Sequence, residues 1–81
     1  MTGDKEILEA ALFASGEPLD ISQLSNLVKG KNARELLQQL MEEYSQRGSA
    51  LEIKEIEGRV VMQVMPEYAE KVRSLAPKEL R

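Results

Sequence analysis

Hydrophobic residues recur at helical spacing through the middle of the chain. Between residues 32 and 48 they stand three and four positions apart, as on a helix with one buried face: Ala33, Leu36, Leu37, Leu40, Met41 and Tyr44. Asn32 suits the N-cap, and Glu35 is placed to close a capping box. Gly48 can adopt the left-handed conformation that ends a helix. The pattern predicts a helix around which the rest of the chain packs.

Two further helices are predicted before this one. The first spans residues 4–15 and ends at Gly16. Asp20 and Gln23 form a second capping-box pair, which starts a helix running from Ile21 to about Lys29. The first helix is expected to bury Ile7, Leu8, Ala11, Ala14 and Ser15, with Ala10 and Leu12 at the edges of this face. The second is expected to bury Ile21, Leu24, Leu27 and Val28, and to stop at Gly30.

After Gly48 the hydrophobic period changes from 3.6 to two. Residues 51–56 and 59–64 flank Glu57 and Gly58, which predicts a β-hairpin with a two-residue turn and Gly58 at positive φ. Pairing Ile56 with Arg59 produces one apolar face: Leu51, Ile53, Val60, Met62 and Val64. The other face is mostly polar but includes Ile56 and Val61. One face is therefore expected to join the core.

The remaining segments complete an α+β fold. Pro66 opens a last helix that is expected to run to about Leu75, and Leu19 is expected to pair as an edge strand. The order helix, short strand, helix, helix, two-stranded wing and C-terminal helix is that of a winged helix-turn-helix. We predict one such domain over residues 1–76, with 77–81 as a tail or the start of a linker to a second domain. The expected core includes Leu8, Leu24, Leu36, Leu37, Leu40, Ile53, Met62 and Val72.

Composition narrows the class of protein. The chain has 81 residues, of which 42% are hydrophobic and 31% charged, a balance typical of one folded domain rather than of a disordered segment. No apolar run approaches the ~20 residues of a membrane span, and the N-terminus does not have the pattern of a signal peptide. The chain has no cysteine. These features favour a cytoplasmic protein that uses no disulfide chemistry.

The chain offers no recognisable catalytic centre. Its serines have no histidine to activate them, because the chain contains none. Glu42 and Glu43 are adjacent on the predicted helix and so do not face each other as an acid–base pair. Without histidine or thiolate, zinc lacks its usual ligands. We therefore expect neither an enzyme nor a bound metal or cofactor.

DNA binding and protein binding are the alternatives. A winged helix commonly lays its third helix in the major groove, and side chains suited to DNA gather near that helix: Lys29, Lys31, Arg34 and Gln38. The net charge of −3 and three glutamates on the same helix oppose this interpretation. Protein binding is favoured by apolar residues beyond what the core faces require: Leu12, Phe13, Ile56 and Val61. For Phe13 there is a second interpretation, in which the ring folds under the following turn.

Three stretches resemble a known family. They are Ile7-Leu8-Glu9-Ala10-Ala11-Leu12-Phe13-Ala14-Ser15-Gly16-Glu17-Pro18-Leu19, then Leu51-Glu52-Ile53 with Gly58, and Val64-Met65-Pro66-Glu67-Tyr68. Their sequence and order are similar to the N-terminal part of segregation and condensation protein B.

The resemblance implies a non-enzymatic, nucleoid-associated subunit of the prokaryotic condensin complex, acting in chromosome condensation and partition. Members of this family bind the kleisin that bridges the SMC ATPase heads, form homodimers and usually contain two winged-helix domains. A DNA-binding transcription regulator is the alternative function.

Overall fold

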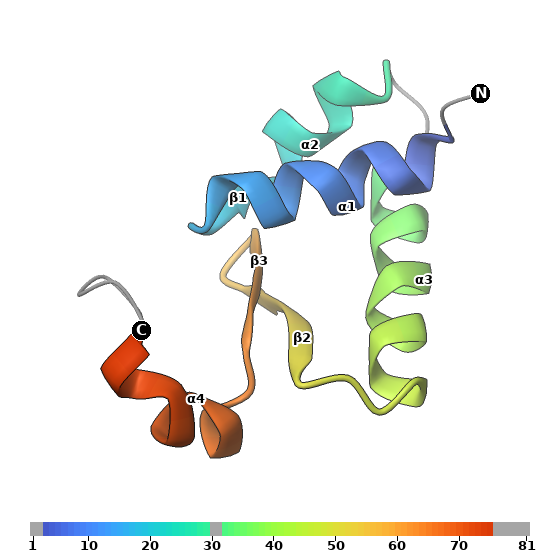
Figure 1. The fold of residues 1–81 in the computed structure, drawn as a ribbon. Helices are drawn as coiled ribbons and strands as arrows, with labels where there is room; N and C mark the ends of the chain where they lie inside the picture. The colour runs from blue at the N-terminus through green and yellow to red at the C-terminus, as the bar shows by residue number, and fades with distance from the viewer. Residues whose placement is uncertain (1–2, 30–31, 76–81) are drawn as a thin grey trace.

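The computed structural model describes residues 3–29 and 32–75 (Figure 1). The elements follow in the order α1 (Asp4–Ser15), β1 (Leu19–Asp20), α2 (Ile21–Leu27), α3 (Ala33–Gln46), β2 (Leu51–Ile56), β3 (Arg59–Val64), α4 (Pro66–Val72) and a 3₁₀ helix, η1 (Arg73–Leu75). This order confirms the predicted α+β winged helix-turn-helix. The predicted stop at Gly30 and the predicted domain boundary after residue 76 lie outside the described residues.

The two strands of the wing, β2 and β3, belong to a three-stranded antiparallel sheet in the order β1-β3-β2. Ile53 pairs with Met62 and Ile56 with Arg59, which confirms the predicted register. Leu19 pairs with Val60, so β1 forms the expected edge strand. At the turn both Glu57 and Gly58 have positive φ, 51° and 80°. A type I′ turn needs this conformation at both positions, and its twist matches that of the two strands.

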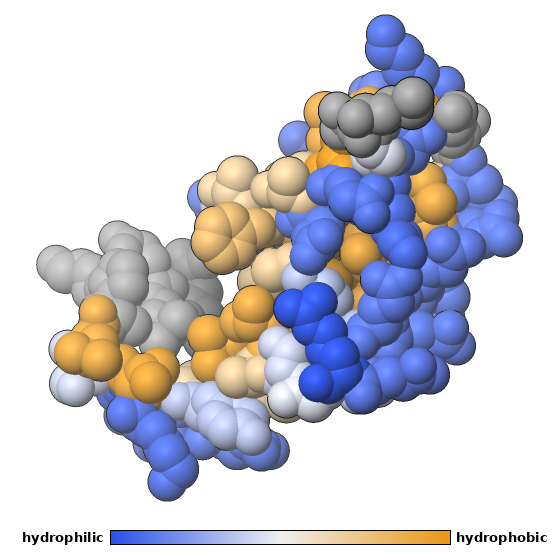
Figure 2. All heavy atoms as spheres, turned by 45° about the vertical axis from the view of Figure 1, so that its right-hand side comes forward, coloured by the Kyte–Doolittle hydropathy of each residue, from blue (hydrophilic) through white to orange (hydrophobic). Residues whose placement is uncertain are grey.

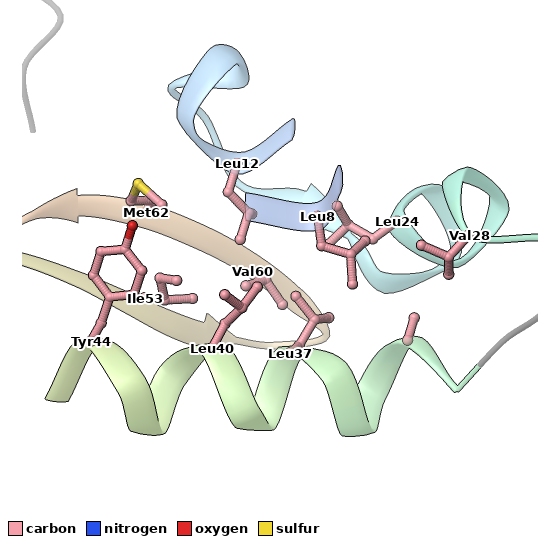
Figure 3. Close-up of a cluster of buried hydrophobic side chains, with 11 residues drawn as sticks. Leu8, Leu12, Leu24, Val28, Leu37, Leu40, Tyr44, Ile53, Val60 and Met62 are labelled. Atoms are coloured by element: carbon pink, nitrogen blue, oxygen red, sulfur yellow. The ribbon is translucent and has the colours of Figure 1, made fainter. Parts of the chain in front are cut away.

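The core lies where α1, α2 and α3 meet one face of the sheet (Figures 1 and 3). The buried cluster is Leu8, Leu12, Leu24, Val28, Ala33, Leu37, Leu40, Tyr44, Ile53, Val60 and Met62. Six of the eight predicted core residues belong to it, and Leu36 packs against it while partly exposed. Val72 was predicted to be buried and is not: 39% of it is exposed, because α4 contributes nothing to this cluster.

The helix ends follow local signals in the sequence. The Glu35 backbone N–H donates to Asn32 Oδ1 at 3.2 Å, and the Asp20 N–H donates to Gln23 Oε1 at 3.0 Å. Gly48 has a φ of 70°, as a left-handed helix end requires. The second helix is shorter than predicted, because α2 ends at Leu27 and Lys29 turns to a φ of 54°.

Two helices depart from the faces predicted for them. Leu12 was expected at the edge of the apolar face of α1 but is 1% exposed, since Leu8 and Leu12, one turn apart, both point into the core. Ala14, expected on that face, is exposed. Leu24 and Val28 are buried as predicted, but Leu27, expected on the same face, is exposed. Local spacing alone did not predict these differences.

Candidate protein interface

A pocket of about 370 Å³ opens between α1, α3 and the hairpin. We call it the groove. Its lining is mainly apolar, with two glutamates from α1: Glu6, Glu9, Ala10, Phe13, Tyr44, Leu51 and Met62. Figure 2 shows hydrophobic side chains gathered in a band on one side of the molecule, beside a broad hydrophilic surface. The groove is open to solvent and is not a closed cavity.

The helix α1 has two side-chain faces: one is buried in the core, and the other lines the groove. Glu6, Ala10 and Phe13 stand at i, i+4 and i+7, so they follow one line along the helix, away from Leu8 and Leu12. Phe13 is 75% exposed, which shows that the interpretation in which it folds under the turn is wrong. An exposed phenyl ring gains hydrophobic free energy only when another surface covers it.

Polar contacts hold the rim of the groove in place. The Tyr44 hydroxyl donates a hydrogen bond to the Glu9 carboxylate, and this bond, together with burial, raises the pKa of Tyr44. The Arg47 guanidinium lies 4.4 Å from the centre of the Tyr44 ring, within reach of a cation–π interaction. Lys5 of α1 pairs with Glu43 of α3, and this contact raises the pKa of Lys5. The Tyr44–Glu9 and Lys5–Glu43 contacts cross-link α1 to α3.

The four residues predicted at a protein interface divide into two pairs. Phe13 and Ile56 are exposed, and their roles in binding stay predictions. Leu12 and Val61 were expected to add exposed apolar surface, and this is wrong because both are buried. Leu12 belongs to the core, whereas Val61 lies on the other face of β3, which is the central strand and has a neighbour on each side.

The residues predicted to contact DNA do not form an unopposed basic patch. Lys29, Arg34 and Gln38 are exposed, and Lys31 lies outside the described residues. Arg34 Nη1 lies 3.3 Å from Glu55 Oε2, so a wing carboxylate offsets its charge. In the wing, Arg59 Nε lies 3.1 Å from Asp20 Oδ1. Both arginines that would approach a phosphate backbone thus already have acidic partners. Contact with DNA stays an untested prediction.

Other kinds of site find no support in the part of the chain that the structure describes. Within residues 3–29 and 32–75, acidic residues form no group of three that could hold a metal ion. Over the same residues, no helix has the length and apolar character to cross a membrane.

Sequence reasoning missed the groove. Tyr44, Leu51 and Met62 were placed in the core, although each also lines the pocket. The sequence did contain one indication of it: Glu6, Ala10 and Phe13 have the helical spacing of residues that share one face of α1.

Comparison with known proteins places these features in a family. The element order and sheet topology define a winged helix-turn-helix domain. Residues 6–81 match the family model "Segregation and condensation complex subunit ScpB". The chain therefore belongs to the ScpB family.

Two curated relatives are both called segregation and condensation protein B. The protein from Symbiobacterium thermophilum is 39% identical over 77 residues, which cover 91% of this chain and 35% of that protein. The protein from Clostridioides difficile (strain 630) is 29% identical over 75 residues, covering 88% of this chain and 42% of that protein. The chain thus spans less than half the length of these relatives.

A solved structure has the same fold over nearly the whole chain. It is the crystal structure of a dimer of the ScpB N-terminal domain complexed with an ScpA peptide. The TM-score is 0.80 at 25% sequence identity, and the match covers 95% of this chain and 92% of that one. The present chain is therefore similar to one N-terminal winged-helix domain.

Proposed function

We propose that this chain is the N-terminal domain of a non-enzymatic subunit of the prokaryotic SMC–kleisin condensin complex. In this role it binds the kleisin subunit, through it reaches the SMC ATPase, and acts in chromosome condensation and segregation in the cytoplasm, at the nucleoid. One observation carries the proposal. The similar ScpB domain, matched over 95% of this chain, was crystallised as a dimer with a peptide of ScpA.

The exposed surface supports binding to proteins. Phe13 and Ile56 present apolar side chains to solvent from α1 and from the wing. A domain of this size gains from covering such residues in a complex, because burial of apolar area is the main favourable term in association. We propose that a homodimer and the kleisin cover different parts of this surface.

Binding to the kleisin is tested by a pull-down with the ScpA-like protein from the same organism. The baits are the 81-residue chain and the longer relative from Symbiobacterium thermophilum, each with the ScpA-like protein of its own organism, and calorimetry measures the affinity of any complex. We expect both baits to capture the kleisin. Failure of both, at concentrations where each is folded by circular dichroism, would contradict the proposal.

The same preparation tests the alternative of a transcription regulator. Fluorescence anisotropy with random duplex DNA should show weak binding without sequence preference, because Arg34 and Arg59 already have acidic partners. Nanomolar affinity for one sequence at physiological salt, lost with Arg34→Ala and retained with the exposed control Gln39→Ala, would favour the regulator instead.

A further inference from the structure

Within the described part of the chain, the last helix has an apolar face that lies exposed. Tyr68, Val72 and Leu75 follow one another at i, i+4 and i+7 through α4 and η1, and all three are exposed. None of the residues of α4 is buried. In Figure 1 the helix lies apart from α1, α2 and α3, beyond the open end of the hairpin. Anchors with this spacing are typical of a helix that docks in a groove.

The direction of α4 is set where it leaves the sheet. The Met65 N–H donates to the Ala50 carbonyl at 2.8 Å, which ties the start of the helix to the segment before β2. The Tyr68 and Ala69 N–H groups both donate to the Met65 carbonyl at 2.9 Å, so Met65 caps the first turn of α4. Folding α4 back over the groove of its own chain would require the Met65–Ala50 hydrogen bond to break. A second chain can reach the groove without this cost.

The helix and the groove both combine apolar residues with charged residues of opposite sign. Ala10, Phe13 and Leu51 give the groove an apolar lining, beside the carboxylates of Glu6 and Glu9. On α4, Lys71 directly precedes Val72 and places a cation beside the apolar face. Among the described residues, neither Glu6 nor Lys71 forms a salt bridge, although Glu6 acts electrostatically on its neighbour Lys5. Lys71 could therefore meet Glu6 when Val72 enters the groove.

We propose that α4 of a second copy of this chain docks in the groove, and that the two copies exchange this contact symmetrically. The inference rests on the proposed self-association and specifies its geometry. In a two-fold dimer each chain donates one helix and accepts one, so both unpartnered features are used twice and no surface is left to extend a polymer. Phe13 then forms one wall of the site that holds the partner's helix.

Cysteine trapping tests this contact directly, because the chain contains no cysteine of its own. Ala10→Cys places a thiol in the groove and Val72→Cys places one on α4. When the two single variants are mixed and oxidised, we expect a disulfide-linked dimer that contains one copy of each. Gln39→Cys, on the exposed face of α3, replaces Ala10→Cys in the control mixture and should link to Val72→Cys at least tenfold less.

The other outcomes overturn the proposal. A variant carrying both Ala10→Cys and Val72→Cys that oxidises mainly within one chain would show that α4 covers its own groove. Linkage no greater than that of the control, in variants folded by circular dichroism, would show that α4 docks elsewhere or not at all.

Charge reversal provides an independent measurement. Glu6→Lys and Lys71→Glu should each weaken the dimer severalfold in analytical ultracentrifugation, and the double reversal should restore it. Additive weakening would refute the pairing. The kleisin pull-down separates this inference from the proposed function. A wild-type dimer that captures kleisin but gives no specific cross-link leaves the proposed function standing and removes only the α4 contact.

Discussion

Leu40→Ala should remove a large share of the stability of this domain. Leu40 is 1% exposed and points from α3 toward the sheet, beside Val60 and Ile53 (Figure 3). The substitution deletes three carbon atoms from a closely packed site. At about 0.8 kcal/mol per buried carbon, the lost transfer free energy is roughly 2.4 kcal/mol. The cavity left behind brings the expected total to about 2–5 kcal/mol.

That loss is large for so short a chain. A domain of 81 residues has an unfolding free energy of about 4–12 kcal/mol by the usual value per residue. Urea titration followed by circular dichroism should show a lower midpoint for Leu40→Ala with an unchanged slope. Gln39→Ala is the matched control, because the neighbouring side chain is exposed and its loss should change stability by less than about 0.5 kcal/mol. A change below about 1 kcal/mol for Leu40→Ala would refute the placement of α3 in the core.

Three further predictions concern the groove and the wing. Phe13→Glu should convert a dimer to a monomer in light scattering without loss of helical signal, because the ring is exposed within its own chain. A protein already monomeric at high micromolar concentration would contradict this. The pKa of Tyr44 is raised in the folded protein, so the protonated hydroxyl stabilises the fold. This contribution to stability is fully present below the ordinary pKa of 10.0 and is lost as pH rises through the folded-state pKa. Tyr44→Phe should therefore flatten the fall in melting temperature at alkaline pH, and an unchanged slope would argue against the bond to Glu9. Gly58→Ala should cost about 1–3 kcal/mol in urea, since φ is 80° and no neighbour compensates. A silent change would contradict the type I′ turn.

The sequence by itself determined the elements and their pairing. The cap at Asn32, the glycines at 16 and 48 and the turn at Gly58 act over only a few residues, so they can be identified without knowing the tertiary structure. The hairpin register is equally local, because a shift of one residue would turn every apolar side chain to the wrong face. Once these elements and their order are known, the winged helix-turn-helix follows.

Only the tertiary structure decided which apolar residues are covered. The periodicity of α1 is compatible with several rotations, and contact with α2, α3 and the sheet selected the one that buries Leu12 and exposes Phe13. Val72 has the spacing of a core residue, yet it is 39% exposed and no residue of α4 is buried against the described part of the chain. The groove likewise brings together α1, α3 and the hairpin, which are distant in the chain. Burial depends on what lies opposite a side chain, and the pattern within a single element does not contain that information.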